Sequence, residues 1–101
     1  MPRVVVNKPQ PLDDASAEEL VRIQQAFGVG LRKLRHERLI TLEQLAERAG
    51  LHPNYVGSVE RGERNISLFN VWRIAVGLDL TASQLLEALP RRPHRRSKLP
   101  H

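Results

Sequence analysis

Residues 41–62 of the chain read TLEQLAERAGLHPNYVGSVERG, and their order is the most informative about the fold. Thr41 is a candidate N-cap for a short helix whose apolar side chains recur every three or four residues and which ends at Gly50. Pro53 suits the first turn of a second short helix, because its missing N–H would be unpaired there in any case. Gly62 closes that second helix. The pattern therefore predicts two short helices joined by a tight turn.

The residue types in this stretch fit a close crossing of two helices. Ala46 supplies a small side chain where the helices cross, and Gly50 supplies the left-handed conformation that the turn needs. The apolar positions that hold the pair to the rest of the domain are Leu45, Ala49, Leu51, Val56 and Val59. On the second helix, Asn54, Gly57 and Ser58 are expected to point outward. A helix with such a small polar face can enter the major groove of DNA, which is about 12 Å wide, and reach base edges.

Upstream of the pair, the sequence predicts one long helix from Ala17 to about Glu37. Ser16 and Glu19 have the spacing of a capping box at its start. Its apolar stripe consists of Leu20, Ile23, Phe27, Leu31 and Leu34. A break near residues 28–30 is the alternative, because Gly28 and Gly30 each cost about 1 kcal/mol relative to alanine inside a helix. We favour a single continuous helix.

Downstream of the pair, two more helices are predicted. Ser67 caps a fourth helix that ends at Gly77, and Thr81 with Gln84 forms a capping box for a fifth that runs to Leu89. The apolar residues of the fourth helix are Leu68, Val71, Trp72, Ile74 and Ala75. No alternation of apolar and polar residues predicts a strand of useful length, so the fold class is all-α with five helices.

Length and composition limit the classes of function. At 101 residues, with 41% hydrophobic and 27% charged residues, the chain makes one small folded domain, which excludes a multidomain enzyme. No apolar run approaches the ~20 residues that span a bilayer, so we expect no membrane association. The absence of cysteine removes disulfides and thiolate metal sites. Without a secretory leader, a cytoplasmic location is expected.

The two ends of the chain differ from its middle. Residues 1–15 contain three prolines and no helical periodicity, which indicates an extended or disordered arm before a domain of residues 16–89. Residues 90–101 form a basic tail that we expect to be disordered. The tail accounts for the net charge of +5, since its five bases, listed here, meet no acid: Arg91, Arg92, Arg95, Arg96 and Lys98. It is either a solvated extension or a nonspecific attractor of phosphate.

From about Phe27 to Leu89 the chain resembles the DNA-binding domain of the lambda repressor and Cro family, whose members are XRE-type regulators. The run from Gly50 to Ser67, GLHPNYVGSVERGERNIS, is particularly similar to the restriction-modification controller proteins. The resemblance implies a five-helix lambda repressor-like fold, here with an extended first helix and a helix-turn-helix at residues 42–61. It also implies a sequence-specific transcription regulator that binds a two-fold symmetric site on double-stranded DNA as a homodimer.

The resemblance further implies roles for single residues. Base-reading positions are Asn54, Ser58 and Pro53, and an asparagine can pair in bidentate fashion with adenine. Positions that contact the DNA backbone are Tyr55, Arg64, Asn65, Ser67 and Asn70. Family members commonly have glutamine where Leu42 stands, and controllers often have arginine where Pro53 stands. Since neither side chain here can donate a hydrogen bond, we expect DNA shape to contribute more to specificity.

Two structural roles also follow from the resemblance. Arg35 and Glu60 are expected to form an internal ion pair. Leu85, Leu86 and Leu89 are expected to form the dimer interface, because they offer more apolar area than one short helix needs and relatives dimerise through this region. The upstream part of the first helix, with Leu20 and Ile23, is the second candidate for that interface.

Other classes of function remain as alternatives. The main rival is a protein-interaction module, such as the antitoxin of a two-gene cassette. It would have no need of Tyr55, Arg64 and Asn65. An enzyme is the weakest hypothesis, because the sequence has no nucleophile paired with a base and no phosphate-cradling glycine loop. His36 and His52 have no acidic partner at a useful spacing, so we expect no metal, no cofactor and no small-molecule ligand.

Overall fold

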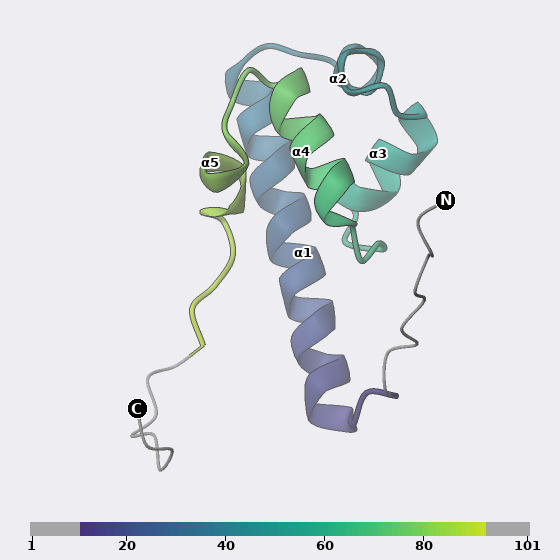
Figure 1. Cartoon of the computed structure of the whole chain (residues 1–101), viewed down its shortest axis with the longest axis vertical. Helices are drawn as coiled ribbons and strands as arrows, with labels where there is room; N and C mark the ends of the chain where they lie inside the picture. Colours follow the sequence, from purple (N-terminus) through teal and green to yellow (C-terminus); the bar gives the residue numbers. More distant parts are fainter. Residues whose placement is uncertain (1–10, 93–101) are drawn as a thin grey trace, which may run out of the picture.

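The computed structural model describes residues 11–92, and these residues form five helices and no strand (Figure 1). The helices are α1 (Asp14–Glu37), α2 (Leu42–Ala49), α3 (Pro53–Glu60), α4 (Leu68–Gly77) and α5 (Ala82–Leu86). The all-α prediction is therefore confirmed. Most of the predicted arm and basic tail lies outside the described residues. Between residues 11 and 92, no helix is both long and apolar enough to cross a membrane.

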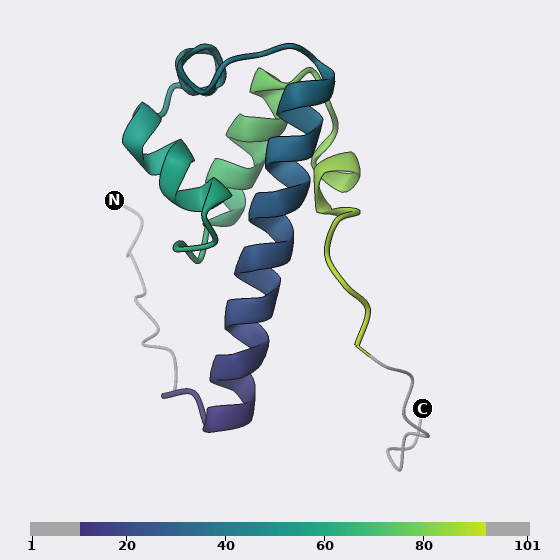
Figure 2. The same ribbon diagram turned by 180° about the vertical axis from the view of Figure 1, so that it is seen from behind.

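The helices are arranged around α1, which runs the length of the molecule (Figures 1 and 2). Helices α2, α3 and α4 gather beside its C-terminal half, and its N-terminal half projects beyond them. Both views place α3 and α5 on opposite sides of α1 and α4. The separation places the surface of α5 away from α3.

The core is built from the apolar stripes that the sequence predicts. Its buried members are Phe27, Leu31, Ile40, Leu45, Ala46, Ala49, Val56, Val59, Val71, Ile74, Ala75, Leu78 and Leu85. Each fully buried leucine or valine stabilises the fold by roughly 1.5–3 kcal/mol relative to an exposed one. Leu68 and Trp72 depart from the expected apolar set of α4, since both side chains are exposed.

The capping residues mostly stand where the sequence places them. Thr41 and Thr81 each form a complete capping box, and Ser67 caps α4. The predicted start of α1 is wrong: the helix begins at Asp14, and the carboxylate of Asp13 accepts a hydrogen bond from the Ser16 N–H at 2.7 Å. An aspartate before the first turn also meets the positive end of the helix dipole, so it displaces the Ser16 capping box.

Helix α5 is shorter than predicted, ending at Leu86. The Glu87 and Leu89 N–H groups bond to the carbonyls three residues back, those of Gln84 and Leu86. Such bonds tighten the chain into turns and end the regular helix.

The two glycines of α1 do not break it, and Gly28 shows why glycine is useful inside this helix. A Cβ built on Gly28 would lie 2.6 Å from the carbonyl oxygen of Val59 in α3 and would also meet that of Glu60. Gly30 makes a similarly close approach to Ala88. The missing side chains let α1 pack directly on its neighbours, so the alternative of a break near residues 28–30 is wrong.

Candidate nucleic-acid interface

The position of α3 is fixed at its start by the turn after α2. Gly50 takes the left-handed conformation with φ 68°, and the Leu51 N–H bonds to the Ala46 carbonyl at 2.9 Å. The His52 side chain then caps α3, because its Nδ1 accepts a hydrogen bond from the Asn54 N–H at 3.0 Å. This cap was not predicted from the sequence, although the position of His52 directly before Pro53 could have indicated it.

The end of α3 is fixed by the ion pair expected between Arg35 and Glu60. Arg35 Nε lies 2.6 Å from Glu60 Oε2, and Nη2 lies 2.9 Å from Oε1. Arg35 Nη1 also donates to the Ile40 carbonyl at 3.0 Å, and the two side chains are only 10% and 8% exposed. Hydrogen bonding to Glu60 raises the pKa of Arg35, so the guanidinium stays charged although it is buried. It ties the last residue of α3 to α1.

Of the residues expected on the outward face of α3, only Asn54 is well exposed. Ser58 is 4% exposed, and its hydroxyl donates to the Tyr55 carbonyl at 2.6 Å while it accepts from Arg64 Nε at 3.0 Å. Gly57 is also buried, and Pro53 is half-buried. The expectation that Gly57 and Ser58 point outward is therefore wrong. The chain returning after α3 brings Arg64 over Ser58, so Ser58 positions this arginine.

Arg61 is a functional candidate that the sequence analysis missed. Its Nη1 lies 3.2 Å from the place where a Gly57 Cβ would stand, so the guanidinium covers the outward face of α3. Arg61 Nε lies 2.9 Å from Glu63 Oε2, and this exposed pair lowers the pKa of Glu63 through the hydrogen bond. The signal was present in the sequence, because Arg61 follows Asn54 by seven residues and therefore shares its face of the helix.

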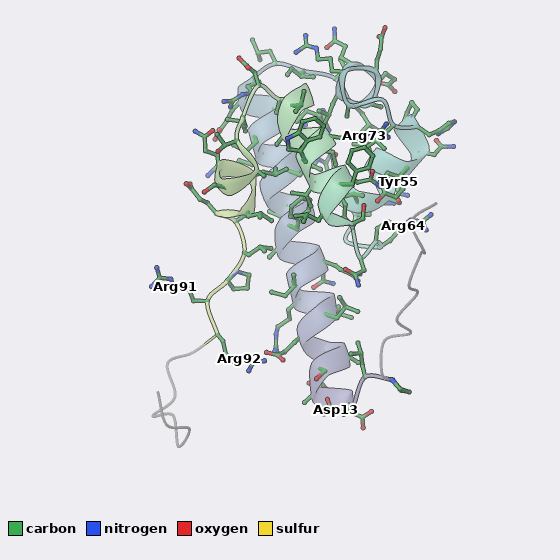
Figure 3. All side chains as sticks on the ribbon, viewed as in Figure 1. Asp13, Tyr55, Arg64, Arg73, Arg91 and Arg92 are labelled. Carbon is green, nitrogen blue, oxygen red and sulfur yellow. The ribbon has the colours of Figure 1, made fainter. Side chains whose placement is uncertain are left out.

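The loop after α3 gathers the residues expected on the DNA backbone. Asn70 Nδ2 donates to the Tyr55 hydroxyl at 3.1 Å, and the Arg64 guanidinium carbon lies 5.8 Å from the centre of the Tyr55 ring. Ser67 and Asn65 are exposed beside them. Figure 3 shows Tyr55 and Arg64 on the same side of the molecule. We call Tyr55, Arg64, Asn65, Ser67 and Asn70 the loop cluster.

The loop cluster is anchored to α1. Gly62 adopts φ 75°, and its carbonyl accepts a hydrogen bond from Gln24 Nε2 at 2.9 Å. A cationic guanidinium, side-chain amides and the N-terminus of α4 all offer donors at this place. Such a set suits phosphate oxygens, which accept hydrogen bonds and carry negative charge.

The expected dimer interface needs correction. Leu85 is 1% exposed and belongs to the core, so it cannot contact a second chain. Leu86 and Leu89 are half-buried and pack against the core from its edge. Together with Leu20 and Ile23 they line an apolar hollow of about 140 Å³. Both leucines pack against the core of their own chain and keep part of their surface exposed, so their place in a dimer interface stays a prediction.

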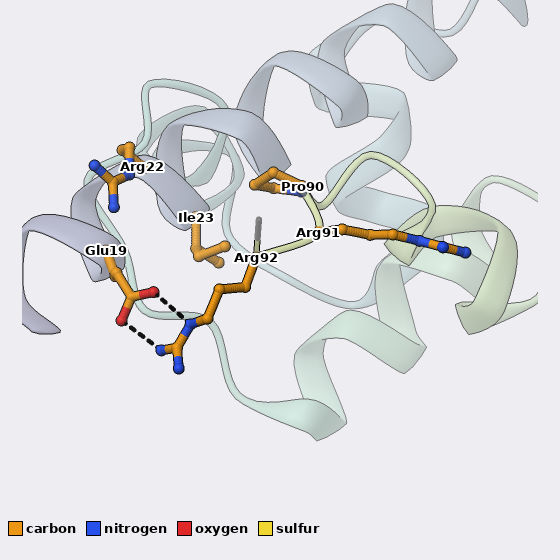
Figure 4. A pocket seen from close by; sticks show the side chains of 6 residues that line it. All are labelled: Glu19, Arg22, Ile23, Pro90, Arg91 and Arg92. Atoms are coloured by element: carbon orange, nitrogen blue, oxygen red, sulfur yellow. Dashed lines mark hydrogen bonds and ion pairs between the residues drawn. The ribbon is translucent and has the colours of Figure 1, made fainter. Parts of the chain in front are cut away.

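A second hollow, of about 610 Å³, lies beside the upstream half of α1 (Figure 4). Its lining residues are Glu19, Arg22, Ile23, Pro90, Arg91 and Arg92. Arg92 Nη2 lies 2.7 Å from Glu19 Oε1, so the start of the basic tail is held by an ion pair. This hollow is separate from α3 and the loop cluster, and it takes no part in the candidate interface.

Comparisons with known proteins agree with this geometry. A helix-turn-helix family model matches residues 31–85. Control protein C.SmaI of Serratia marcescens is 39% identical over 64 residues, covering 63% of this chain and 76% of that protein. Control protein C.MunI of Mycoplasma sp is 41% identical over 64 residues, covering 62% and 86%. The crystal structure of the restriction-modification controller protein C.AhdI from Aeromonas hydrophila superposes with a TM-score of 0.60 at 44% identity, covering 61% of this chain and 94% of that one.

Proposed function

The chain belongs to the helix-turn-helix family of DNA-binding transcription regulators, and we propose that it recognises one specific double-stranded DNA site as a homodimer, with α3 in the major groove. The observation that carries this proposal is the position of Asn54 and Arg61 on the outward face of α3, directly beside the loop cluster. Helix α3 thus presents base-reading groups, while the loop cluster beside it presents groups that can bind phosphate.

The proposed roles follow from chemistry and position. Asn54 reads a base edge, and Arg61, once released from Glu63, reaches a guanine or a phosphate near the end of α3. Arg64, Tyr55 and Asn70 grip the backbone. Pro53 contributes shape only, and Ser58 acts by holding Arg64 at 3.0 Å. Specificity therefore depends on a few direct contacts to bases together with the sequence-dependent deformability of the DNA.

Two copies are required by the size of α3. An eight-residue helix covers only a few base pairs, and a single module seldom reaches the specificity that a regulator needs against a genome. We therefore propose a site with two-fold symmetry whose half-sites lie about 10 base pairs apart. Since this function requires access to DNA, we propose that the protein acts in the cytoplasm without enzymatic activity.

The similarity to control proteins supports a narrower role. Relatives with this name are 39% and 41% identical to the chain, and the C.AhdI structure is that of a restriction-modification controller. We propose that this chain likewise controls a restriction-modification gene pair, with its site upstream of those genes. The antitoxin alternative does not account for the loop cluster, which a protein-masking module does not need.

Selection of binding sites from random duplex DNA tests the proposal. The wild type should select one two-fold symmetric sequence, and Asn54→Ala should lose about 1–3 kcal/mol on that sequence and relax the preference at one base position. Ser83→Ala, on the opposite side of the molecule, is the matched control and should select the wild-type sequence. A wild type that selects no sequence would refute sequence-specific DNA binding. If Asn54→Ala selects the same sequence as the wild type, Asn54 does not read a base.

Contact between the loop cluster and DNA phosphates can be recognised by the salt dependence of binding. Arg64→Ala should weaken binding to all sequences alike and reduce the salt dependence by about one phosphate contact. Arg22→Ala removes the same charge at the exposed upstream half of α1, away from α3 and from the loop cluster, and should leave the salt slope unchanged. An Arg64→Ala slope equal to that of the wild type would remove Arg64 from the interface.

A further inference from the structure

Leu42 is the one apolar residue of α2 that the core does not bury completely. The other three, Leu45, Ala46 and Ala49, are buried. Leu42 is the first residue of the helix, packs against the edge of the core and keeps part of its side chain exposed. The start of α2 therefore presents an apolar group at the surface.

This apolar group adjoins the outward face of α3. Leu42 Cδ2 lies 3.4 Å, and Arg61 Nη1 lies 3.2 Å, from the place where a Gly57 Cβ would stand. Because Gly57 has no side chain, both groups can approach the same point on α3. Asn54 precedes Gly57 by three residues and therefore shares this face of the helix. The outward face of α3 is thus bordered by a guanidinium and by the methyl groups of a leucine.

The major groove of DNA offers such a leucine one kind of partner. Base edges there carry hydrogen-bond donors and acceptors, together with a single apolar group, the C5 methyl of a pyrimidine. Asn54 and Arg61 can bond to the donors and acceptors, whereas the Leu42 side chain has no group that forms a hydrogen bond. Thymine always carries the C5 methyl, and cytosine carries it only after methylation. Leu42 therefore suits a methylated pyrimidine edge.

We propose that Leu42 reads the C5 methyl group of one pyrimidine in each half-site. The inference rests on the proposed function, because it requires α3 to lie in the major groove. Base pairs are stacked about 3.4 Å apart, so Leu42 Cδ2 and Arg61 Nη1 stand within about two base-pair steps of each other. The methyl-bearing base should therefore lie next to, or one step beyond, the position that Arg61 contacts.

Uracil in place of thymine tests the proposal, because it removes the C5 methyl and keeps the hydrogen-bonding groups of the base. On the sequence that the wild type selects, each thymine is replaced in turn, and the dissociation constant is measured by fluorescence anisotropy. At one position the wild type should bind about fourfold more weakly per half-site, which corresponds to ~0.8 kcal/mol for one buried carbon.

A second set of duplexes identifies the source of the methyl group. In these duplexes each cytosine of the selected sequence is replaced in turn by 5-methylcytosine. A loss of affinity with uracil would show that Leu42 reads a thymine. A gain of about fourfold with 5-methylcytosine would show that it reads a methylated cytosine, and the protein would then sense the methylation state of its site.

Variants of Leu42 show whether this side chain senses the methyl group. Leu42→Ala should bind equally well with and without the methyl group. Leu42→Met keeps an apolar side chain of similar volume and should retain the difference. Val21→Ala, which shortens an exposed apolar side chain in the upstream half of α1, is the matched control and should also retain it. Thermal melts show which variants are folded, and Leu42→Gln replaces Leu42→Ala if the latter unfolds.

The outcomes separate this inference from the proposed function. A wild type whose affinity depends neither on uracil nor on 5-methylcytosine would overturn the role of Leu42 and leave sequence-specific binding intact. A methyl effect that persists in Leu42→Ala, or in Leu42→Gln in its place, would also overturn it, because the methyl group would then act through DNA shape or another side chain. If the wild type selects no sequence, the proposed function fails, and the role of Leu42 fails with it.

Discussion

Glu60 forms the ion pair that connects α3 to α1, and its removal should cost a large part of the free energy of unfolding. Glu60→Ala would leave the buried Arg35 guanidinium without its carboxylate, and breaking a buried pair costs about 3–5 kcal/mol. A domain of this size has roughly 5–15 kcal/mol in total. Urea denaturation followed by circular dichroism measures the loss.

The exposed pair between Arg61 and Glu63 provides the control for Glu60. Glu63→Ala also removes a carboxylate from an arginine, but both partners are in solvent, where ion pairs contribute little. Its denaturation midpoint should match that of the wild type. If Glu60→Ala also matched the wild type, the buried pair would have no structural role.

Gly28 sets the distance between α1 and α3, again at the scale of one residue. Gly28→Ala should destabilise the fold by about 1–3 kcal/mol, because the new methyl group would stand 2.6 Å from the Val59 carbonyl oxygen and would push the helices apart. Gly57→Ala is the matched test, and it should raise the free energy of unfolding where Gly28→Ala lowers it. Its methyl group meets only the flexible ends of Arg61 and Leu42, so the better helix propensity of alanine should prevail. Equal melting temperatures for the two variants would contradict this interpretation.

Single residues were also where prediction from sequence was weakest. Ser58 was expected outside because it is small and polar, but its burial depends on the loop that brings Arg64 back over α3. Leu85 was assigned to an interface by its type, although its place beside Thr81 and Gln84 puts it on the inner side of a very short helix. Such errors arise because burial is decided by segments distant in the sequence. The Arg35–Glu60 pair was anticipated only through family resemblance.

At the scale of the element, the start of α1 should respond to pH. The hydrogen bond from the Ser16 N–H to the ionised Asp13 side chain holds the pKa of that carboxyl below its ordinary 3.8. A lowered pKa means that the cap stabilises the helix above pH 3.8 and is lost as the pH falls through the lowered value. The protection factor of the Ser16 amide, which is its exchange rate by NMR relative to the intrinsic rate at the same pH, should therefore fall in that acidic range.

Asp13→Asn separates the charge of this cap from its shape. Asparagine is also a good N-cap but does not titrate, so the protection factor at Ser16 should no longer depend on pH while protection at neutral pH remains. Asp13→Ala should lose protection at every pH. A protection factor in the asparagine variant that still falls in acid would show that another group controls the start of α1.

All five elements could be predicted from sequence because their signals are local. Thr41, Ser67 and Thr81 each mark a helix start, and the periodic apolar residues mark its buried side. The exposure of Trp72 was not predicted, because the sequence analysis grouped it by residue type with Val71, Ile74 and Ala75, which are buried. The ends of α1 and α5 were less predictable, because several residues there can serve equally well as caps or turns.

At the level of the whole molecule, the proposed homodimer should make thermal stability depend on concentration. Anything that binds only the folded chain stabilises it by mass action, and a second copy is such a ligand. The melting temperature of the wild type should therefore rise with protein concentration. A melting temperature that is the same at all concentrations would count against a homodimer in the absence of DNA.

The way α3 is attached has a consequence for redirecting the protein to new targets. Its inner side is fastened to α1 by Gly28 and the Arg35–Glu60 pair, whereas Asn54 and Arg61 are exposed and take no part in that attachment. Randomising these two positions should therefore yield libraries in which most members still fold, and new binding preferences could be selected without repairing the scaffold. The same separation would let natural descendants of this chain exchange one operator for another by a few substitutions.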